Sequence, residues 1–144
     1  MKIDWYDTIL HAEQVVNLLY QDRRRFRQDT LEYATPGKDG KLKENVEAWV
    51  ALENDRVIGY TTIVLDEYGI GRDCLTIVLD NYKCCGVGTE LMKHKRANTT
   101  ARFILTKISS DNIPSLRAAI SARYSISDIG VYEDNGKVWL EFMG

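Results

Sequence analysis

Residues 75–92 constrain the fold of this chain more than any other segment. Residues 75–79 are an apolar, β-branched run that predicts a buried strand, and an amphipathic helical pattern follows from Val87 onward. The short connection between them carries two glycines, Gly86 and Gly88. Glycine lets the backbone come close to a ligand, and the free N–H groups of a helix's first turn favour negative charge. The segment therefore predicts an anion site, for which a diphosphate is the natural ligand.

The spacing of these glycines excludes two common nucleotide-binding motifs. A P-loop requires G-x-x-x-x-G-K-(S/T), and the dinucleotide fingerprint requires G-x-G-x-x-G with an acidic residue about twenty positions later. This chain has Lys83-x-x-Gly86-x-Gly88. That pattern resembles the (Q/R)-x-x-G-x-(G/A) signature of the GNAT superfamily of N-acetyltransferases, whose loop holds the pyrophosphate of acetyl-coenzyme A. Lys83 replaces the usual Gln or Arg and keeps the positive charge. A plain strand-to-helix turn would contain the same glycines, so the rest of the chain has to agree.

The composition is that of one ordinary globular domain spanning residues 1–144. Hydrophobic residues make up 44% and charged residues 28% of the chain. The chain is long enough to build a hydrophobic core without disulfides or metals. No apolar run approaches the roughly 20 residues that span a bilayer, and the N-terminus lacks the apolar core of a signal peptide. We therefore expect a cytoplasmic protein with no membrane partner.

The cysteines and the net charge set further limits. Cys74, Cys84 and Cys85 are odd in number and lack the spacing of a zinc site, so we expect neither a disulfide framework nor a metal. A formal net charge of −2 argues against a protein that coats nucleic acid indiscriminately, although it allows a local basic patch.

Apolar periodicity and turn residues predict the element order β-α-α-β-β-β-α-β-α-β-β. Strands are expected over residues 1–5, 48–53, 56–65, 74–79, 103–108, 127–132 and 137–142, and helices after Asp7 or Thr8, over 22–33, over 86–96 and from Asn112. Hairpin turns are expected at Asn54-Asp55 and Asn135-Gly136. Gly59, inside the third strand, indicates a bulge or a close backbone approach.

This element order also resembles the GNAT fold, along nearly the whole chain. The resemblance implies an α+β fold in three layers, with a mixed, mostly antiparallel central sheet of about seven strands flanked by about four helices. The strand before the glycine loop is expected to splay from its neighbour, and coenzyme A is expected to lie in the opening. The implied activity is transfer of an acetyl group from acetyl-coenzyme A to a primary amine, by direct attack in a ternary complex.

The resemblance also implies cofactor-binding residues. Backbone groups at the strand's end would pair with the pantetheine arm, and N–H groups of residues 84–89 would hold the pyrophosphate, assisted by the Lys83 charge. The expected contacts are Ile77, Val78, Leu79, Lys83, Cys84, Cys85, Gly86, Val87, Gly88 and Thr89. The strand residues can serve the core as well, because the ligand would use their backbone. The two thiols are interpreted as incidental rather than nucleophilic.

The helix from Asn112 matches a second family motif in part. Family members often have Asn at its start, a small residue three positions later and Tyr seven positions after the Asn. Asn112 and Ser115 match, whereas Ala119 stands at the tyrosine position. Asn112 and Ser115 are expected cofactor contacts, with helix capping as an equal alternative. Ala119 cannot protonate the leaving thiolate, so Tyr124 or Tyr132 would have to, unless they are packed aromatics.

The resemblance also implies a candidate base and candidate acceptor-binding residues. Asp73 stands near the start of the strand before the glycine loop, where some family branches have a carboxylate, and a surface turn is its alternative role. In this fold the first two helices border the acceptor site. Arg24 and Arg27 could therefore contact an anionic acceptor, such as an aminoacyl-tRNA, another nucleic acid or a phosphorylated small molecule. A solvated helix face would explain the same arginines.

Two other functions remain open at this point. A module that binds coenzyme A without turnover would fit Ala119, and a nucleic-acid-associated acetyltransferase would fit the arginines of residues 23–27. The favoured partner is an amine on a small molecule, a peptide or an aminoacyl group. A homodimer is left open as the assembly.

Overall fold

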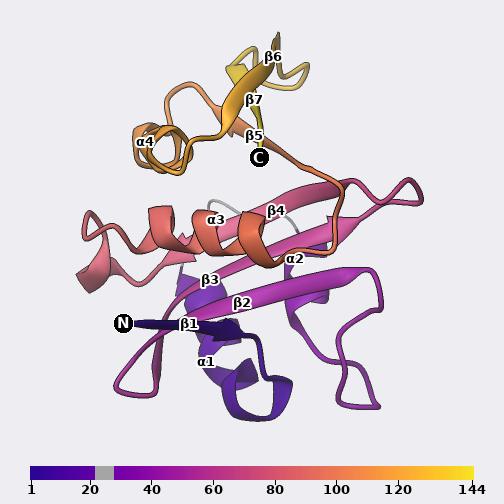
Figure 1. Ribbon diagram of the computed structural model, residues 1–144, viewed down its shortest axis with the longest axis vertical. Helices are drawn as coiled ribbons and strands as arrows, with labels where there is room; N and C mark the ends of the chain where they lie inside the picture. The colour runs from indigo at the N-terminus through magenta and orange to yellow at the C-terminus, as the bar shows by residue number, and fades with distance from the viewer. Residues whose placement is uncertain (22–27) are drawn as a thin grey trace.

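In the part of the chain that the structure describes, residues 1–21 and 28–144, a single seven-stranded sheet packs against four α-helices (Figure 1). The coordinates are a computed structural model, and for residues 28–30, 73 and 74 only the backbone is described. The elements are β1 (Lys2–Trp5), α1 (Thr8–Gln21), α2 (Gln28–Ala34), β2 (Val46–Glu53), β3 (Arg56–Leu65), β4 (Gly71–Val78), the 3₁₀ turn η1 (Asp80–Tyr82), α3 (Val87–Asn98), β5 (Ile104–Ser109), α4 (Ile113–Ser121), β6 (Ser125–Val131) and β7 (Val138–Met143).

The sheet has the strand order β1-β2-β3-β4-β5-β7-β6. Every neighbouring pair is antiparallel except β4 and β5, which run parallel at the centre. Helices lie on both sides of the sheet, with α1 and α2 opposite α3 (Figure 1). The predicted α+β fold in three layers, with a mixed and mostly antiparallel sheet, is therefore confirmed. None of the described helices combines the length and the apolar character needed to cross a bilayer.

Local turn chemistry joins β2 to β3 as the sequence predicts. Asn54 and Asp55 have φ of 50° and 63°, the left-handed backbone that a two-residue hairpin turn requires. The pairing then shifts from Leu52–Val57 to Ala51–Gly59, so β3 bulges beside Gly59. The expected turn and the expected bulge are both present.

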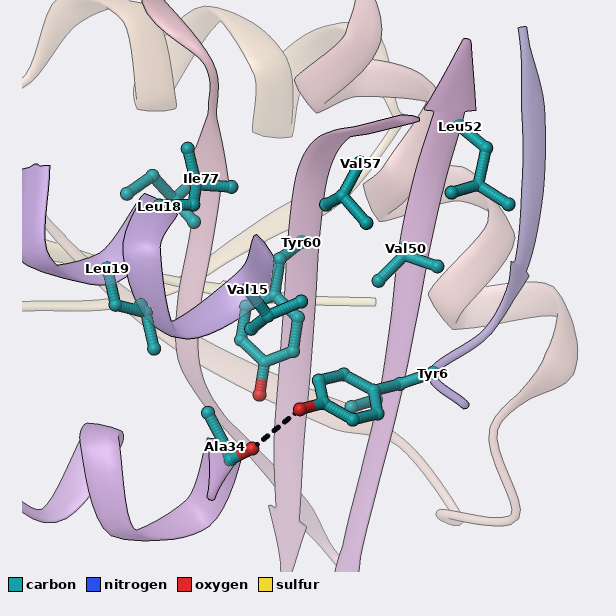
Figure 2. Packing of buried hydrophobic residues seen from close by; sticks show 11 residues of the cluster. Tyr6, Val15, Leu18, Leu19, Ala34, Val50, Leu52, Val57, Tyr60 and Ile77 are labelled. Carbon is teal, nitrogen blue, oxygen red and sulfur yellow. Dashed lines mark hydrogen bonds between the residues drawn. The ribbon is translucent and has the colours of Figure 1, made fainter. Parts of the chain in front are cut away.

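Apolar residues on the two faces of β2 and β3 build separate cores. On one face, side chains from α1 pack against Val50, Tyr60 and Ile77 (Figure 2). On the other face, Val87 and Leu91 of α3 pack against the sheet. A strand with both faces covered reads as a continuous apolar run rather than as an alternating one, as β2 does from Ala48 to Leu52.

Tyr6 ties the end of β1 to the end of α2. Its ring lies edge-on to Tyr60 at a centroid distance of 5.7 Å, and its hydroxyl donates to the Ala34 carbonyl at 2.9 Å (Figure 2). The carbonyl lies in the last turn of α2, where intrahelical donors run out. Tyr6 thus satisfies a buried acceptor and fixes α2 against the sheet.

Most element boundaries differ from prediction by a few residues. β3 has the predicted bounds, whereas β4 begins at Gly71 because its first residues pair with both β3 and β5. The first residues of the predicted helix over 22–33 lie outside the described residues, and α2 covers Gln28–Ala34. On α4, the apolar residues Ile113 and Ile120 are exposed.

The Tyr6→Phe variant should unfold more easily by about 1 kcal/mol at neutral pH, because the buried Ala34 carbonyl loses its donor. Burial raises the pKa of Tyr6 to about 12, from 10.0 in the free side chain. The unfolded chain therefore releases this proton at lower pH than the folded protein, so the contribution of Tyr6 to stability is lost as the pH rises from about 10 to about 12. The free energy of unfolding, measured with urea, should fall less between neutral pH and about pH 11 for the variant than for the wild type. An equal fall in both proteins would contradict this account.

Candidate active site

β4 and β5 are neighbours in the sheet but pair only at their beginnings. Their register contains Gly71 with Ile104 and Arg72 with Leu105, and no later pair within these two described strands. Beyond these residues a cleft of about 610 Å³ is lined by β4, the following loop, α3, β5, α4 and Tyr132. The predicted splay of the central strand pair is therefore confirmed. We call this space the β4–β5 cleft.

The orientation of the β4 backbone follows from one hydrogen bond. The Leu79 N–H donates to the Ile58 carbonyl of β3 at 2.8 Å, so Leu79 directs its backbone groups towards β3. Successive residues of a strand direct these groups to opposite edges. Ile77 therefore shares the orientation of Leu79, whereas Val78 and Thr76 turn their N–H and C=O groups towards the cleft. An extended ligand could pair with them as an added strand would.

This geometry places the three predicted strand residues in different positions relative to the cleft. Leu79 does not line the cleft, and its carbonyl accepts from the Tyr82 N–H at 2.8 Å. Ile77 lines the cleft, but its side chain lies in the core. Of the three predicted residues only Val78 turns its backbone to the cleft, and Thr76 was missed. The sequence could not decide this because the alternation is set by pairing with β3.

The N-terminus of α3 opens onto the cleft without a side-chain cap. Gly86 is the N-cap residue, with φ of 83° and no side-chain hydrogen bond. By contrast, the Asp7 carboxylate caps α1 and the Asn112 side chain caps α4. Residues Val87 to Thr89 line the cleft, so the first N–H groups of α3 and the positive end of its dipole lie beside it. This arrangement suits the predicted anion site.

Gly88 leaves space at the entrance of the cleft. A Cβ built there would lie 3.8 Å from Val78 Cγ2 and 3.9 Å from Ala118 Cβ, which are ordinary contact distances. Packing alone would therefore accept a side chain at Gly88. Without one, the room between β4 and α4 is free for a ligand, and bare backbone permits the close approach that a diphosphate needs.

Gly59 determines how closely α3 approaches the sheet. A Cβ at Gly59 would lie 2.9 Å from Leu91 Cδ1 and 3.1 Å from Val87 Cγ1, closer than side chains normally pack. The absence of a side chain at the β3 bulge thus lets the first turns of α3 rest on the strand. The uncapped helix end is held at the cleft as a result.

The loop before α3 places three predicted residues in different environments. Lys83 and Cys84 line the cleft, whereas Cys85 is exposed outside it, so the position of Cys85 does not support its predicted contact. Lys83 Nζ lies 2.7 Å from Asp80 Oδ1, and the lysine side chain is 40% exposed. Its charge is therefore partly matched by a carboxylate already. Cys84 has φ of 63°, a left-handed backbone that is uncommon outside glycine.

The start of α4 forms the wall opposite the glycine loop. Asn112 Oδ1 accepts from the Ser115 N–H at 3.4 Å, which is the capping role considered above, and both residues also line the cleft. The Asn112 amide NH₂ is a separate donor group that capping does not use. Next to it, a hydrogen bond from Lys137 holds the pKa of exposed Asp111 below its ordinary value, with the two charged groups 3.0 Å apart.

The tyrosines considered as acids lie in unlike places. Tyr124 is 5% exposed, does not line the cleft, and donates its hydroxyl to the Met92 carbonyl at 2.9 Å. Its position does not support the predicted catalytic role, because a buried hydroxyl that is already bonded cannot reach a ligand. Tyr132 does line the cleft. Ala119 is buried in the core that joins α3, α4 and the C-terminal strands.

Three further predictions fall on residues whose side chains the structure does not describe. Asp73 lies in β4 opposite Ile63 of β3, one residue beyond the last β4–β5 pair. Its role as a base stays a prediction. Arg24 and Arg27 lie outside the described residues.

Sequence reasoning missed most of the wall formed by β5 and α4. The unpredicted polar residues that line the cleft are Thr76, Tyr82, Thr106, Lys107, Ser109, Arg117 and Ser121. A signal existed on α4, where Pro114, Arg117 and Ser121 follow one another at helical spacing on one face. For β5 there was none, because contact with the cleft depends on where the pairing with β4 stops.

Comparison with known proteins identifies the family. The sequence matches the model of the acetyltransferase (GNAT) family over residues 12–119. The chain belongs to this family and is an acetyltransferase by class. No curated protein sequence gives a significant match.

Solved structures with the same fold cover almost the whole chain. An aminoglycoside 6′-N-acetyltransferase complexed with coenzyme A has 12% identity and a TM-score of 0.77, over 100% of this chain and 96% of that one. A variant of spermidine N-acetyltransferase from Vibrio cholerae has 10% identity and a TM-score of 0.73, over 99% and 94%. The ribosomal-protein-S18-alanine N-acetyltransferase from Escherichia coli has 10% identity and a TM-score of 0.71, over 99% and 91%. At such identities the likeness shows a shared fold.

The Gly59→Val variant should lower the free energy of unfolding by about 1–3 kcal/mol, because the new side chain collides with Leu91 and Val87 of α3. Urea denaturation measures the loss. Adding Leu91→Ala makes room for the valine, so the double variant should lose less than the sum of the two single losses. Strict additivity, or an unchanged Gly59→Val variant, would show that α3 does not rest on this glycine.

Proposed function

We propose that this protein transfers an acetyl group from acetyl-coenzyme A to a primary amine. The observation that carries the proposal is the meeting of two features in one cleft: the uncapped N-terminus of α3 and the open backbone edge of β4. The first suits a diphosphate, and the second suits an extended arm that carries amides. Coenzyme A contains both groups in adjacent positions.

The residues of the cleft would divide the binding between them. The N–H groups of Val87, Gly88 and Thr89 would hold the diphosphate. The Lys83 ammonium group would exchange its pairing with Asp80 for a pairing with the diphosphate. Backbone groups of Val78 and Thr76 would pair with the pantetheine amides, and Asn112 and Ser115 would contact the ligand from α4. When bound, acetyl-coenzyme A supplies a thioester carbon for direct attack by an amine aligned beside it.

Two protons have to move during transfer. The amine has to lose one before it attacks, and Asp73 stays the predicted base. The leaving thiolate can gain one from Tyr132, which lines the cleft. Ala119 has no hydroxyl to offer. A thiolate is a fair leaving group, and acid catalysis is typically worth about 10²–10⁴-fold, so Tyr132 would assist rather than be indispensable.

The acceptor is proposed to be a primary amine on a small molecule, a peptide or an aminoacyl group. The structural neighbours named above act on an aminoglycoside, on spermidine and on an alanine of a ribosomal protein, so the fold accommodates amines of very different size. Arg24 and Arg27 would favour an anionic acceptor, including a nucleic acid. A cytoplasmic location fits the exposed free thiols of Cys84 and Cys85.

Acetyl-coenzyme A should raise the melting temperature, because it binds the folded chain only. At a hundredfold excess over its Kd the gain is about 2.7 kcal/mol, or roughly 5–10 °C for a domain of this size. Differential scanning fluorimetry measures the shift. If no concentration up to the millimolar range shifts the melting temperature, acetyl-coenzyme A is not the acyl donor.

The Gly88→Asp and Gly86→Asp variants should abolish this shift. Gly88→Asp fills the entrance between Val78 and Ala118 and adds a negative charge at the helix end, without a steric clash in the unliganded protein. The matched control for Gly86→Asp is Gly40→Asp. Gly40 has a φ of 76°, close to the 83° of Gly86, and a Cβ built there would likewise have no atom within 4 Å. Gly40 does not line the cleft. Gly40→Asp should bind normally. Normal binding by both cleft variants would show that the α3 N-terminus is not the site.

The Tyr132→Phe variant should lower kcat about 10- to 100-fold while leaving the affinity for acetyl-coenzyme A within about threefold. The reason is that the hydroxyl would act only when the thiolate leaves. Acetylated amine should be measured by mass spectrometry, because exposed Cys84 and Cys85 would react with a thiol reagent. An unchanged kcat would show that a group other than Tyr132 protonates the thiolate.

A module that binds coenzyme A without turnover is the second candidate, favoured by the buried Ala119. A panel of amines separates the two functions. Tight binding of acetyl-coenzyme A with no acetylated product from polyamines, aminoglycosides, N-terminal peptides and aminoacyl esters would favour the module.

A further inference from the structure

Lys95 is a buried lysine that apolar packing does not explain. It lies in the last turn of α3 and is 0% exposed, on a helix whose other buried residues are Val87, Leu91 and Met92. Taking an ammonium group out of water is unfavourable unless other groups bond to it. A leucine or methionine would fill such a place without that cost. The ammonium group therefore needs bonding partners inside the protein.

The Lys95 ammonium lies against two threonines of the sheet. Its Nζ is 2.9 Å from Thr61 Oγ1 of β3 and 3.5 Å from Thr76 Oγ1 of β4, and the two hydroxyl oxygens are 2.7 Å apart. An ammonium group has no lone pair and can only donate. Both threonine oxygens therefore act as acceptors towards Lys95. We call these three residues the Lys95–threonine cluster.

The hydrogen bond between the two threonine hydroxyls can run in either direction. Thr61 can donate either to Thr76 Oγ1 at 2.7 Å or to the Leu75 carbonyl at 3.3 Å. When Thr61 donates to the Leu75 carbonyl, Thr76 donates to Thr61. When Thr61 donates to Thr76 instead, Thr76 accepts from both Thr61 and Lys95, and its own proton can go to a third group. A hydrogen-bond acceptor bound beside Thr76 would select this second arrangement.

Thr76 offers this proton at the β4–β5 cleft. It is half-buried and lines the cleft together with Met92 of α3 and Thr106 of β5. It lies nearer than Val78 to the point where the two strands still pair, by two residues or about 7 Å of strand. A ligand with its diphosphate at Gly86–Gly88 and its arm along β4 would carry the far end of the arm towards Thr76.

We propose that the Thr76 hydroxyl donates a hydrogen bond to the acyl carbonyl oxygen of a bound thioester, and that Lys95 and Thr61 are positioning residues that hold the hydroxyl in this orientation. The inference rests on the proposed function, since it requires an acyl thioester in the cleft. As the amine attacks, the C–N bond forms, the oxygen gains negative charge, and the C–S bond breaks as the carbonyl returns. Thr76 keeps its proton throughout. A fixed donor backed by a positive charge binds the charged oxygen better than the neutral one, which favours the transition state.

The test compares acetyl-coenzyme A with free coenzyme A, so it needs no knowledge of the acceptor. Isothermal titration gives the ratio of the two Kd values for the wild type, Thr76→Val and Thr76→Ser. Thr76→Val keeps the shape of the side chain but not its proton, and should weaken acetyl-coenzyme A relative to coenzyme A by about threefold to tenfold. Thr76→Ser keeps the hydroxyl and should retain most of the wild-type ratio.

A spectroscopic readout separates donation from a general packing effect. The infrared stretch of a ¹³C-labelled acetyl carbonyl falls in frequency when the oxygen accepts a hydrogen bond, so it should be lower in the wild type than in Thr76→Val. Lys95→Met should shift it towards the Thr76→Val value. The matched control is Thr62→Val, because Thr62 is a buried threonine of β3 that donates to the Glu47 carbonyl at 3.0 Å and does not line the cleft. It should change neither the ratio nor the stretch.

The outcomes distinguish the two proposals. A wild type that binds neither coenzyme A nor acetyl-coenzyme A contradicts the proposed function itself. A wild type that binds both, with the same Kd ratio and carbonyl stretch in Thr76→Val, leaves the proposed function standing and overturns the role of Thr76. Should Lys95→Met fail to fold, the two Thr76 variants still decide the matter.

Discussion

The site depends on the early end of hydrogen bonding between β4 and β5. Backbone N–H and C=O groups inside a protein need partners, and a sheet normally supplies them along the whole length of each strand. Here the two central strands share only Gly71–Ile104 and Arg72–Leu105, so the β4 edge beyond them is left for another molecule. A ligand that pairs with this edge completes the sheet.

Helix packing keeps the strands apart where hydrogen bonds do not hold them together. Met92 of α3 and Ala119 of α4 belong to one buried core with residues of β5 and β7. The Tyr124 hydroxyl reaches from the end of α4 to the Met92 carbonyl, and Arg96 Nη1 donates to the Arg123 carbonyl at 3.1 Å. The α3–α4 contact therefore fixes the width of the cleft. In this light Tyr124 has a structural role.

Features encoded by a few adjacent residues were predictable from the sequence. The glycine loop, the helix after it and the Asn54–Asp55 turn each depend on local backbone preferences, and all are present. Most of the expected contacts in that loop also line the cleft, with Cys85 as the exception. Element order was predictable for the same reason, and it was enough to indicate the fold.

Features that depend on how distant segments meet were not predictable. The direction of the Val78 and Leu79 backbones depends on pairing with β3, and the burial of the Tyr124 hydroxyl depends on where α4 meets α3. The burial of Lys95 against Thr61 was likewise not anticipated. Helical periodicity places a residue on a face, and it does not reveal what covers that face.

The two residue pairs between β4 and β5 also have a mechanical consequence. They divide the protein into a larger N-terminal body and a smaller one made of β5, α4, β6 and β7, which Figure 1 shows standing away from the other strands. Sheet bonds join the two bodies only at one corner, so local opening along this seam breaks few of them. A molecule seated between the bodies touches both, and its binding energy adds to their attachment. Departure of the ligand would remove these added contacts and leave the core shared by α3, α4, β5 and β7 to join the two bodies.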